Sequence, residues 1–354
     1  MTRPGPPKPS RAGRETARSR RRRLPITLIA TTALAVWCPA PVAAHASGEG
    51  ALIVSVSCAP RSSFCVAVDL GGRAFELHGT TWTTARSPVD RRGLTQVSCT
   101  SASFCMGVDG RGRALILNGS SWRTSMLPGA FPATLVSCVT ARFCVAADAF
   151  GAARTYNGRS WSKSRRLGPV TGSDSGPAVQ GVSCATTSFC GAVDSSGDAA
   201  TFNGRSWSGG FVDSNADFSL SSISCPSAGW CMAVDGYGDA LSYRSGQWSG
   251  LEPVEPDSRL ASVSCVSSAF CLAADEDQGD VLAFDGAGWG PPTTIADVFA
   301  VSCASPRLCV AGTSAGTVAL FDGTSWSVPA ALAPSSASGR RGTARGPGSG
   351  ASRA

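Results

Sequence analysis

Short apolar stretches alternate with turns rich in Gly, Asp and Asn along nearly the whole chain, and the pattern recurs about every 40 residues. Residues 94–126 show one complete unit, in which LTQVSC, FCMGVD and RALIL precede a segment around Trp122. Apolar segments this short, bounded by turn residues, are typical of β-strands rather than helices. Each unit is therefore predicted to form four short strands.

The turns have the residues that tight β-turns require. Asp109 and Gly112 suit the first and fourth positions of a type I turn. Asn118 and Gly119 favour a two-residue hairpin, because both residue types tolerate positive φ. Six units carry the turn Asp, which we interpret as an acceptor for backbone N–H groups of its own turn rather than as a charged rim: Asp69, Asp109, Asp148, Asp194, Asp235 and Asp275.

Seven such units follow one another, and four-stranded repeats of this period predict a seven-bladed β-propeller. An open all-β solenoid is the alternative. A Trp closes every unit, and its recurrence indicates repeated packing rather than a set of sugar-stacking platforms. The propeller is predicted to span residues 47–330, with repeats starting near residues 52, 94, 133, 179, 220, 260 and 298.

Fourteen of the 15 cysteines belong to the repeat, two in each unit, and a Ser precedes every leading Cys. The two lie at the end of the first strand and the start of the second, where facing Cβ atoms can approach disulfide distance. A zinc site is the alternative, but its usual CxxC spacing and neighbouring His are missing. We predict one disulfide per blade: Cys58–Cys65, Cys99–Cys105, Cys138–Cys144, Cys184–Cys190, Cys225–Cys231, Cys265–Cys271 and Cys303–Cys309.

The first 46 residues have the order of a secretory signal peptide. Residues 1–23 contain nine Lys or Arg, residues 24–37 are apolar, and Ala44-His45-Ala46 matches a cleavage site. Cleavage after Ala46 would give a secreted, extracellular protein without a membrane span, in a compartment that permits disulfides. An uncleaved signal anchor is the alternative.

Removing this leader changes the charge of the chain. The full sequence has a net charge of +7, but residues 47–354 hold 22 basic and 23 acidic residues. Nucleic-acid binding, which needs a clustered basic face, is therefore not expected. The Gly-, Ser- and Arg-rich residues 331–354 are predicted to be disordered. We expect a monomer without cofactors.

The NGxSW turn, as in residues 157–161, resembles the Asp-box of sialidase-like (BNR-type) propellers. The order of the unit also resembles photosystem-assembly-factor-like propellers, in a Cys-rich version found in secreted proteins of high-GC Gram-positive bacteria. The resemblance implies that the box residues hold the outer hairpins, away from any active site: Asn118, Asn157, Asn203, Asp285 and Asp322. Sialidase activity is not implied, because Arg73 and Arg113 share one repeat position and no third Arg matches it.

No catalytic constellation stands out in the sequence. The chain after residue 46 has a single His, His78, which occupies a predicted surface turn. Alternating carboxylates at Asp275, Asp277 and Asp280 form a weak calcium candidate without the closing Glu of a full calcium loop.

The connectors between units vary in length and sequence, whereas the Cys and Asn-Gly turns hardly vary. Because binding residues tend to lie on loops held by a rigid scaffold, we expect any binding site on the face formed by the connectors. The long connector 162–179 supplies the candidate binding residues Lys163, Arg165 and Arg166, together with the carboxylate of the Ser173-Asp174 step. The sequence thus predicts a non-enzymatic binding propeller for an extracellular protein or a cell-wall glycan. The alternative is a glycan-active protein, either a lectin or a sialidase-like glycoside hydrolase.

Overall fold

The computed structural model describes residues 52–85, 93–129, 131–168, 178–213 and 220–332. The chain divides into two units, Met1–Ala46 and Ser47–Ala354, and every described residue belongs to the second. The predicted signal peptide lies outside the described residues. So does the predicted disordered tail 331–354 except for its first two residues, because Ala331 belongs to a strand and Leu332 is buried in the core.

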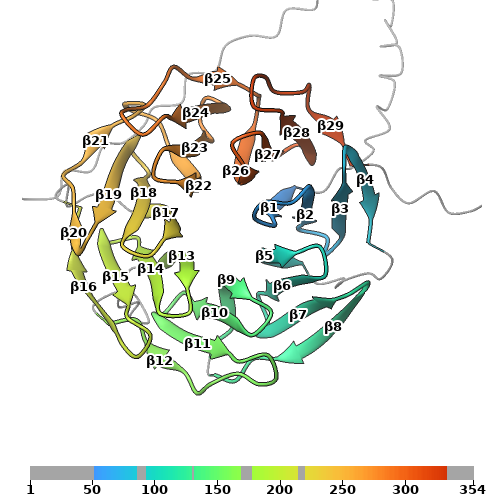
Figure 1. Cartoon of the computed structure of the whole chain (residues 1–354), viewed down its shortest axis with the longest axis vertical. Coiled ribbons are helices and arrows are strands. Elements are labelled where there is room, and N and C mark those ends of the chain that lie inside the picture. Colours follow the sequence, from blue (N-terminus) through green and yellow to red (C-terminus); the bar gives the residue numbers. More distant parts are fainter. Residues whose placement is uncertain (1–51, 86–92, 130, 169–177, 214–219, 333–354) are drawn as a thin grey trace, which may run out of the picture. The chain divides into compact units, whose positions relative to one another are not determined.

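The described residues form seven antiparallel sheets arranged as blades around a ring (Figure 1). Six sheets have four strands, and the sheet of blade 5 has five because its outermost strand is split in two. The predicted seven-bladed β-propeller is confirmed, and the open solenoid is wrong. The first strands of the blades lie innermost in the ring: β1 (Ile53–Cys58), β5 (Leu94–Ser101), β9 (Ala133–Thr140), β13 (Val179–Thr186), β17 (Leu220–Ser227), β22 (Leu260–Ser267) and β26 (Val298–Ser305).

The remaining strands follow outward in chain order. The second strands are β2 (Phe64–Asp69), β6 (Phe104–Asp109), β10 (Phe143–Asp148), β14 (Phe189–Asp194), β18 (Trp230–Asp235), β23 (Phe270–Asp275) and β27 (Leu308–Thr313). The third strands are β3 (Ala74–His78), β7 (Arg113–Asn118), β11 (Ala152–Tyr156), β15 (Asp198–Phe202), β19 (Asp239–Arg244), β24 (Asp280–Phe284) and β28 (Thr317–Phe321). The fourth strands are β4 (Thr81–Thr84), β8 (Ser121–Met126), β12 (Arg165–Arg166), β16 (Trp207–Phe211), β20 (Gln247–Trp248), β25 (Thr293–Thr294) and β29 (Ala330–Ala331).

The hydrophobic core lies between neighbouring blades rather than within one of them. Strand β2 is buried along its whole length, which explains why its sequence FCVAVD reads as a continuous apolar run. One core cluster joins Phe75 and Leu77 of blade 1 to Val310 and Val318 of blade 7. Neither blade could bury these side chains alone, so the packing itself favours a closed ring.

A disulfide links the first and second strands of every blade, as predicted, and the zinc alternative is wrong. The paired Cα atoms lie 3.9–4.1 Å apart. In blade 1 the Cys58 N–H points away from the second strand and donates to Ser302 Oγ of the neighbouring blade 7. The two Cys are therefore a non-hydrogen-bonded pair, the type in which facing side chains lie closest.

The Ser that precedes each leading Cys connects neighbouring blades. Its Oγ accepts a hydrogen bond of 2.8–3.0 Å from the backbone N–H of the leading Cys in the following blade. The innermost strand has an unpaired edge toward the centre, and these hydroxyls satisfy one N–H group of that edge in each blade. The seven acceptors are Ser57, Ser98, Ser137, Ser183, Ser224, Ser264 and Ser302.

The ring closes without an exchanged strand among the described residues, because blades 1 and 7 each consist of consecutive strands. Ser302 Oγ accepts from Cys58 N at 2.9 Å, and Arg61 N donates to Ala304 O at 2.9 Å. The closing seam therefore carries the same Ser–Cys hydrogen bond as the other six seams.

The fourth strands are less regular than the sequence predicts. In blades 3, 5, 6 and 7 the strand is interrupted after its Trp and resumes four residues later, as between Trp161 and Arg165. In blade 5 the resumed strand is β21 (Glu252–Pro253), which pairs with β19. The Trp side chains pack on an aromatic ring of the third strand in five blades, with ring centroids 5.1–5.4 Å apart, in agreement with the predicted packing role.

Candidate binding site on the connector face

One face of the ring is formed by the turns between second and third strands together with the connectors between blades, and we call it the connector face. In five blades a backbone bond holds the connector to the turn: Leu127 N donates to Gly112 O at 2.9 Å in blade 2, and Val254 N donates to Gly238 O at 2.8 Å in blade 5. The same bond recurs in blades 3, 4 and 6. The connectors are therefore variable loops on a fixed base.

The turn Asp residues are fully buried and bond to their own turns, as predicted. In blade 2, Asp109 Oδ1 accepts from the backbone N–H groups of Arg111 at 3.0 Å and Arg113 at 2.8 Å. Blades 3, 4 and 5 repeat this pair of bonds. In blade 7, Thr313 replaces the Asp and its Oγ1 lies 2.7 Å from Thr317 Oγ1.

In blades 1–3 the second carboxylate oxygen of the turn Asp meets a guanidinium group. Arg73 Nε and Arg113 Nε donate to the Oδ2 atoms of their own turn Asp residues, at 2.5 and 2.7 Å. In blade 3 the corresponding third-strand position is Ala152, and Arg154, two residues further on, lies 3.0 Å from Asp148. Arg154 is the largest fully buried side chain of the described chain, and sequence reasoning did not identify it.

In blades 4 and 5 the position of Arg73 and Arg113 holds a second carboxylate, Asp198 or Asp239. Ser196 Oγ lies 2.9 Å from Asp194 Oδ1 and 3.4 Å from Asp198 Oδ2, so the two carboxylates share one hydroxyl. Burial raises the pKa of Asp198, and the charge of Asp194 raises it further. Burial and the charge of Asp235 likewise raise the pKa of Asp239.

In blades 4–6 the second carboxylate oxygen of the turn Asp accepts no hydrogen bond from a described residue. The buried Oδ2 atoms of Asp194, Asp235 and Asp275 have no hydrogen-bond partner within the part of the chain that the structure describes. In blade 5, burial raises the pKa of Asp235 although the N–H groups of its own turn lower it. The blades therefore fall into two groups, with internally neutralised turns in blades 1–3 and carboxylate pairs in blades 4–6.

Exposed large apolar side chains also collect on the connector face. Leu70 and Tyr237 lie in turns between second and third strands and are 60% and 47% exposed. Phe131 lies in a connector and packs on Phe150, with ring centroids 4.2 Å apart. Phe299, at the start of an innermost strand, is 37% exposed.

The predicted binding residues are only partly placed by the structure. Lys163, Arg165 and Arg166 are exposed at the outer edge of blade 3, where β12 pairs with the start of β11. Arg165 Nη1 donates to the backbone oxygen of Arg205, in a hairpin of blade 4. The Ser173-Asp174 step lies outside the described residues.

The structure does not bring all three calcium candidates together, although Asp275 lies opposite Asp280 across strands β23 and β24. Asp275 is buried and accepts from the backbone N–H groups of Asp277 and Gln278, while Asp277 is exposed. Among the described residues there is no group of three His, Cys, Asp or Glu side chains arranged to hold a metal ion.

The opposite face carries the Asn-Gly and Asp-Gly turns. Asn157 Oδ1 accepts from Arg159 N and Ser160 N, both at 2.9 Å, and Asn203, Asp285 and Asp322 repeat this arrangement. These bonds lower the pKa of Asp285 and, with the Thr324 hydroxyl as the largest cause, lower the pKa of Asp322 to about 2. Asn118 instead pairs with Ser121 in a two-residue hairpin.

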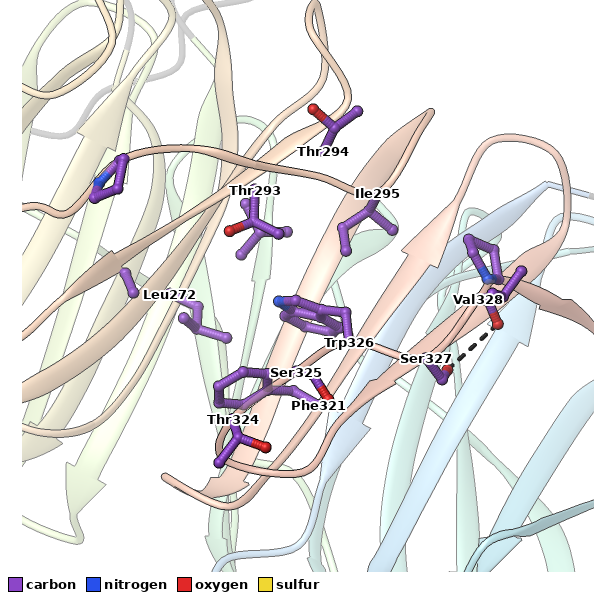
Figure 2. A pocket seen from close by; sticks show the side chains of 14 residues that line it. Leu272, Thr293, Thr294, Ile295, Phe321, Thr324, Ser325, Trp326, Ser327 and Val328 are labelled. Carbon is purple, nitrogen blue, oxygen red and sulfur yellow. Dashed lines mark hydrogen bonds between the residues drawn. The ribbon is translucent and has the colours of Figure 1, made fainter.

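Cavities are present in addition to these faces. A largely apolar cavity of about 590 Å³ lies between blades 6 and 7, with Ile295, Phe321 and Trp326 in its wall (Figure 2). A second, of about 260 Å³, lies among the innermost strands and is lined by uncharged residues that include Gln96, Gln180 and Ser262.

Among the residues that the structure describes, no helix has the length and apolar character needed to cross a membrane. Seven disulfides indicate an oxidising environment.

Comparison with known proteins places the fold but not the chemistry. No protein-family model matches the chain, and no curated protein matches it in sequence. The solved structure of YCF48 bound to D1 peptide has a TM-score of 0.59 and 15% identity, over 77% of this chain and 94% of that chain. The WD40 propeller domain of Doa1 has a TM-score of 0.62 and 11% identity, over 79% of this chain and 94% of that chain.

An enzyme shares the same architecture. Virginiamycin B lyase from Staphylococcus aureus has a TM-score of 0.66 and 6% identity, over 77% of this chain and 95% of that chain. One similar propeller is thus a lyase and another holds a peptide, so the fold is compatible with both functions. The chain is structurally similar to these propellers. The similarity does not identify its function, which has to be inferred from the residues on its own surface.

Proposed function

We propose that this protein is a secreted, non-enzymatic propeller that binds an extracellular protein or a cell-envelope component through its connector face, as a monomer. The observation that carries the proposal is the concentration of exposed apolar side chains on this face, with Leu70, Phe131 and Tyr237 in turns or connectors. Exposed large apolar groups on a soluble domain often mark an interaction surface. The disulfides and Ser–Cys bonds supply the rigid base that such loops need.

The second candidate, a glycan hydrolase of sialidase type, receives less support from the same face. Its chemistry needs free arginines to bind an acidic sugar, but Arg73 and Arg154 are committed to Asp69 and Asp148 of their own turns. The predicted disulfide-permissive compartment and signal peptide fit a secreted binding protein, and the similar propeller YCF48, solved with a bound peptide, offers a precedent.

The proposal is tested by binding of the oxidised chain from residue 47 to cell-wall polymers and glycans, and by cross-linking capture from the cell envelope. The double variant Leu70→Ser/Phe299→Ser should weaken the binding that is found. The matched control is Val328→Ser, which removes an 85% exposed apolar side chain at the outer edge of blade 7. Equal losses in both variants, or reproducible turnover of a bound glycan, would contradict the proposal.

A further inference from the structure

We infer that the connector face of blades 4–6 binds an arginine- or lysine-rich polypeptide segment, and that its cationic groups pair with Asp198 and Asp239, which stand where blades 1 and 2 have an internal Arg. The inference deepens the proposed function and rests on it. We call this surface the acidic sector and define it by Asp198, Asp239, Asp280 and the acidic residues of the adjoining turns and connectors.

The molecule itself contains the precedent. In blades 1 and 2 the residue that opens the third strand is Arg73 or Arg113, and its guanidinium neutralises the buried carboxylate of the turn. The same carboxylate in blade 3 meets Arg154, which comes from a different position of the strand. A guanidinium thus reaches the same carboxylate oxygen from two different positions in the sequence. This indicates that a cation beside this oxygen stabilises the turn.

Blades 4 and 5 reverse the charge at the same position. Asp198 and Asp239 add a carboxylate where Arg73 and Arg113 add a guanidinium. The Oδ2 atoms of Asp194 and Asp235 are fully buried and lack a hydrogen-bond partner among the described residues. A buried carboxylate oxygen without a partner costs free energy, and a cation at the half-buried second carboxylate would offset that cost.

The surrounding surface is acidic as well. Arg205, Arg244 and Arg259 are the basic residues of 178–298, and the first two lie in hairpins of the opposite face. Arg259 pairs with Glu276 at 2.6 Å. The remaining acidic residues of these connectors and turns, at least partly exposed, are Glu252, Glu255, Asp257, Asp277 and Asp297.

The distribution of these acids favours a chain of cations over a single ion. Within the described part of the protein no three acidic side chains converge on one point, so a calcium ion would find too few protein ligands. Carboxylates instead interact in blades 4 and 5, and in blade 6 Asp280 lies opposite the turn residue Asp275 across strands β23 and β24. An extended peptide with several cationic side chains can contact successive blades, and clustered acidic charge would accelerate its association.

Tyr237 adds an aromatic contact in the middle of this surface. It lies in the turn between Asp235 and Asp239 and is 47% exposed. An aromatic ring beside carboxylates is a suitable contact for a guanidinium or ammonium group, which can stack on the ring while it pairs with the acid.

The test is a titration of the oxidised chain 47–354, a compact unit of its own, into a fluorescent nine-arginine peptide followed by anisotropy. Asp198→Asn/Asp239→Asn should weaken binding by about tenfold, which corresponds to about 1.4 kcal/mol. The matched control is Asp285→Asn/Asp322→Asn, which removes two charges from the opposite face, where Asn157 and Asn203 already fill the equivalent turns. Binding of the control should stay within about twofold of the wild type.

Equal weakening in the two double variants would overturn the inference, because it would show attraction to net charge alone. It would also be overturned if the peptide failed to bind, or if calcium raised the unfolding temperature and the peptide did not. The proposed function fails separately: envelope capture that depends on Leu70 and Phe299 but not on the Asp variants would retain the binding role and reject only the cationic partner.

Discussion

Blades 1–3 and blades 4–6 share the turn between the second and third strands, but the side chains near its buried Asp carry opposite charges. An Arg lies there in blades 1–3, and a second Asp in blades 4–6. Both groups keep the buried Asp, because one of its oxygens caps backbone N–H groups that the turn would otherwise leave unpaired. The other oxygen has no hydrogen-bond partner that is common to all these blades. It meets an internal guanidinium in blades 1–3 and a neighbouring carboxylate in blades 4 and 5. The repeat thus keeps the geometry of the turn and leaves its charge free to differ.

The largest expected effect comes from removing the buried cation that neutralises the turn Asp of blade 3. Arg154→Leu should lower the free energy of unfolding by about 3–5 kcal/mol, because it leaves Asp148 buried without its cation. The loss should fall near the lower end, since Nε and Nη1 of Arg154 have no partner among the described residues and their burial is itself costly. Urea unfolding measures the difference.

Arg73→Met is the control for that variant. Arg73 makes the same contact but its side chain is 41% exposed, so its loss should cost at most about 1 kcal/mol. Equal losses for the two variants would show that burial does not control the strength of these pairs.

A smaller effect is expected from a substitution at Gly129, which lies against the Arg154 guanidinium. Gly129 has φ of 146°, and a Cβ placed on it would lie 1.8 Å from Arg154 Nη2. Gly129→Ala should therefore cost about 1–3 kcal/mol through backbone strain and displacement of the guanidinium. Gly210→Ala, at a position with no atom within 4 Å of the added Cβ, is the matched control and should change little.

Asp239→Arg tests whether blade 5 can be converted into the type of blades 1 and 2. The new guanidinium should reach the unpartnered Oδ2 of Asp235 and raise the free energy of unfolding by about 1 kcal/mol. The reciprocal change, Arg113→Asp, should destabilise blade 2. If both variants lower stability equally, the two groups of blades differ in more than the charge of this residue.

The carboxylate pairs should also make stability depend on pH. The pKa values of Asp198, Asp235 and Asp239 are raised above 3.8, so the protonated forms are favoured in the folded state. Their stabilising contribution is complete below the unfolded pKa and is lost as pH rises through the folded values. Unfolding curves from pH 3.5 upward should show this decline, and Asp198→Asn/Asp239→Asn should flatten it. An unchanged slope in that variant would assign the pH dependence to other groups.

The smallest effect is expected on the opposite face. Asp322→Asn should leave the thermal midpoint unchanged at neutral pH, because Asn157 makes the same bonds in blade 3. With a folded pKa of about 2, Asp322 stabilises the turn above its unfolded pKa and loses this effect as pH falls toward 2. Midpoints measured at pH 2 and pH 7 would reveal any departure.

The sequence was sufficient for the parts of the fold that recur in every unit. The Cys pairs, the turn Asp and the closing Trp have fixed spacing, so strand order and disulfides follow from them directly. The Ser before each leading Cys was visible as a pattern, yet its role needed the ring, because its partner lies in the next blade about 40 residues away in sequence. A local motif cannot reveal a bond to a neighbouring repeat.

The candidate site was harder to predict because its determinants do not repeat. Arg154 lies two residues from the position of Arg73 and Arg113, so its contact with Asp148 at 3.0 Å does not follow from the repeat. The residues at the interruptions of the fourth strands share no sequence pattern, as Pro291-Pro292 in blade 6 and Lys163-Ser164 in blade 3 show. The interruptions could therefore not be predicted. The acidic pairs were present in the sequence, but their significance depended on comparing equivalent positions of different blades.

Closure of the ring by non-covalent contacts at the seam between blades 7 and 1 bears on resistance to proteolysis. Because no described blade borrows a strand from another, the backbone already has one opening between two blades, at Ser302 and Cys58. A protease that cuts a single connector elsewhere would create a second opening of the same kind, while the disulfides stay intact within the blades. Nicked molecules should therefore remain assembled, and circular permutants with new termini in any connector should fold to the same ring.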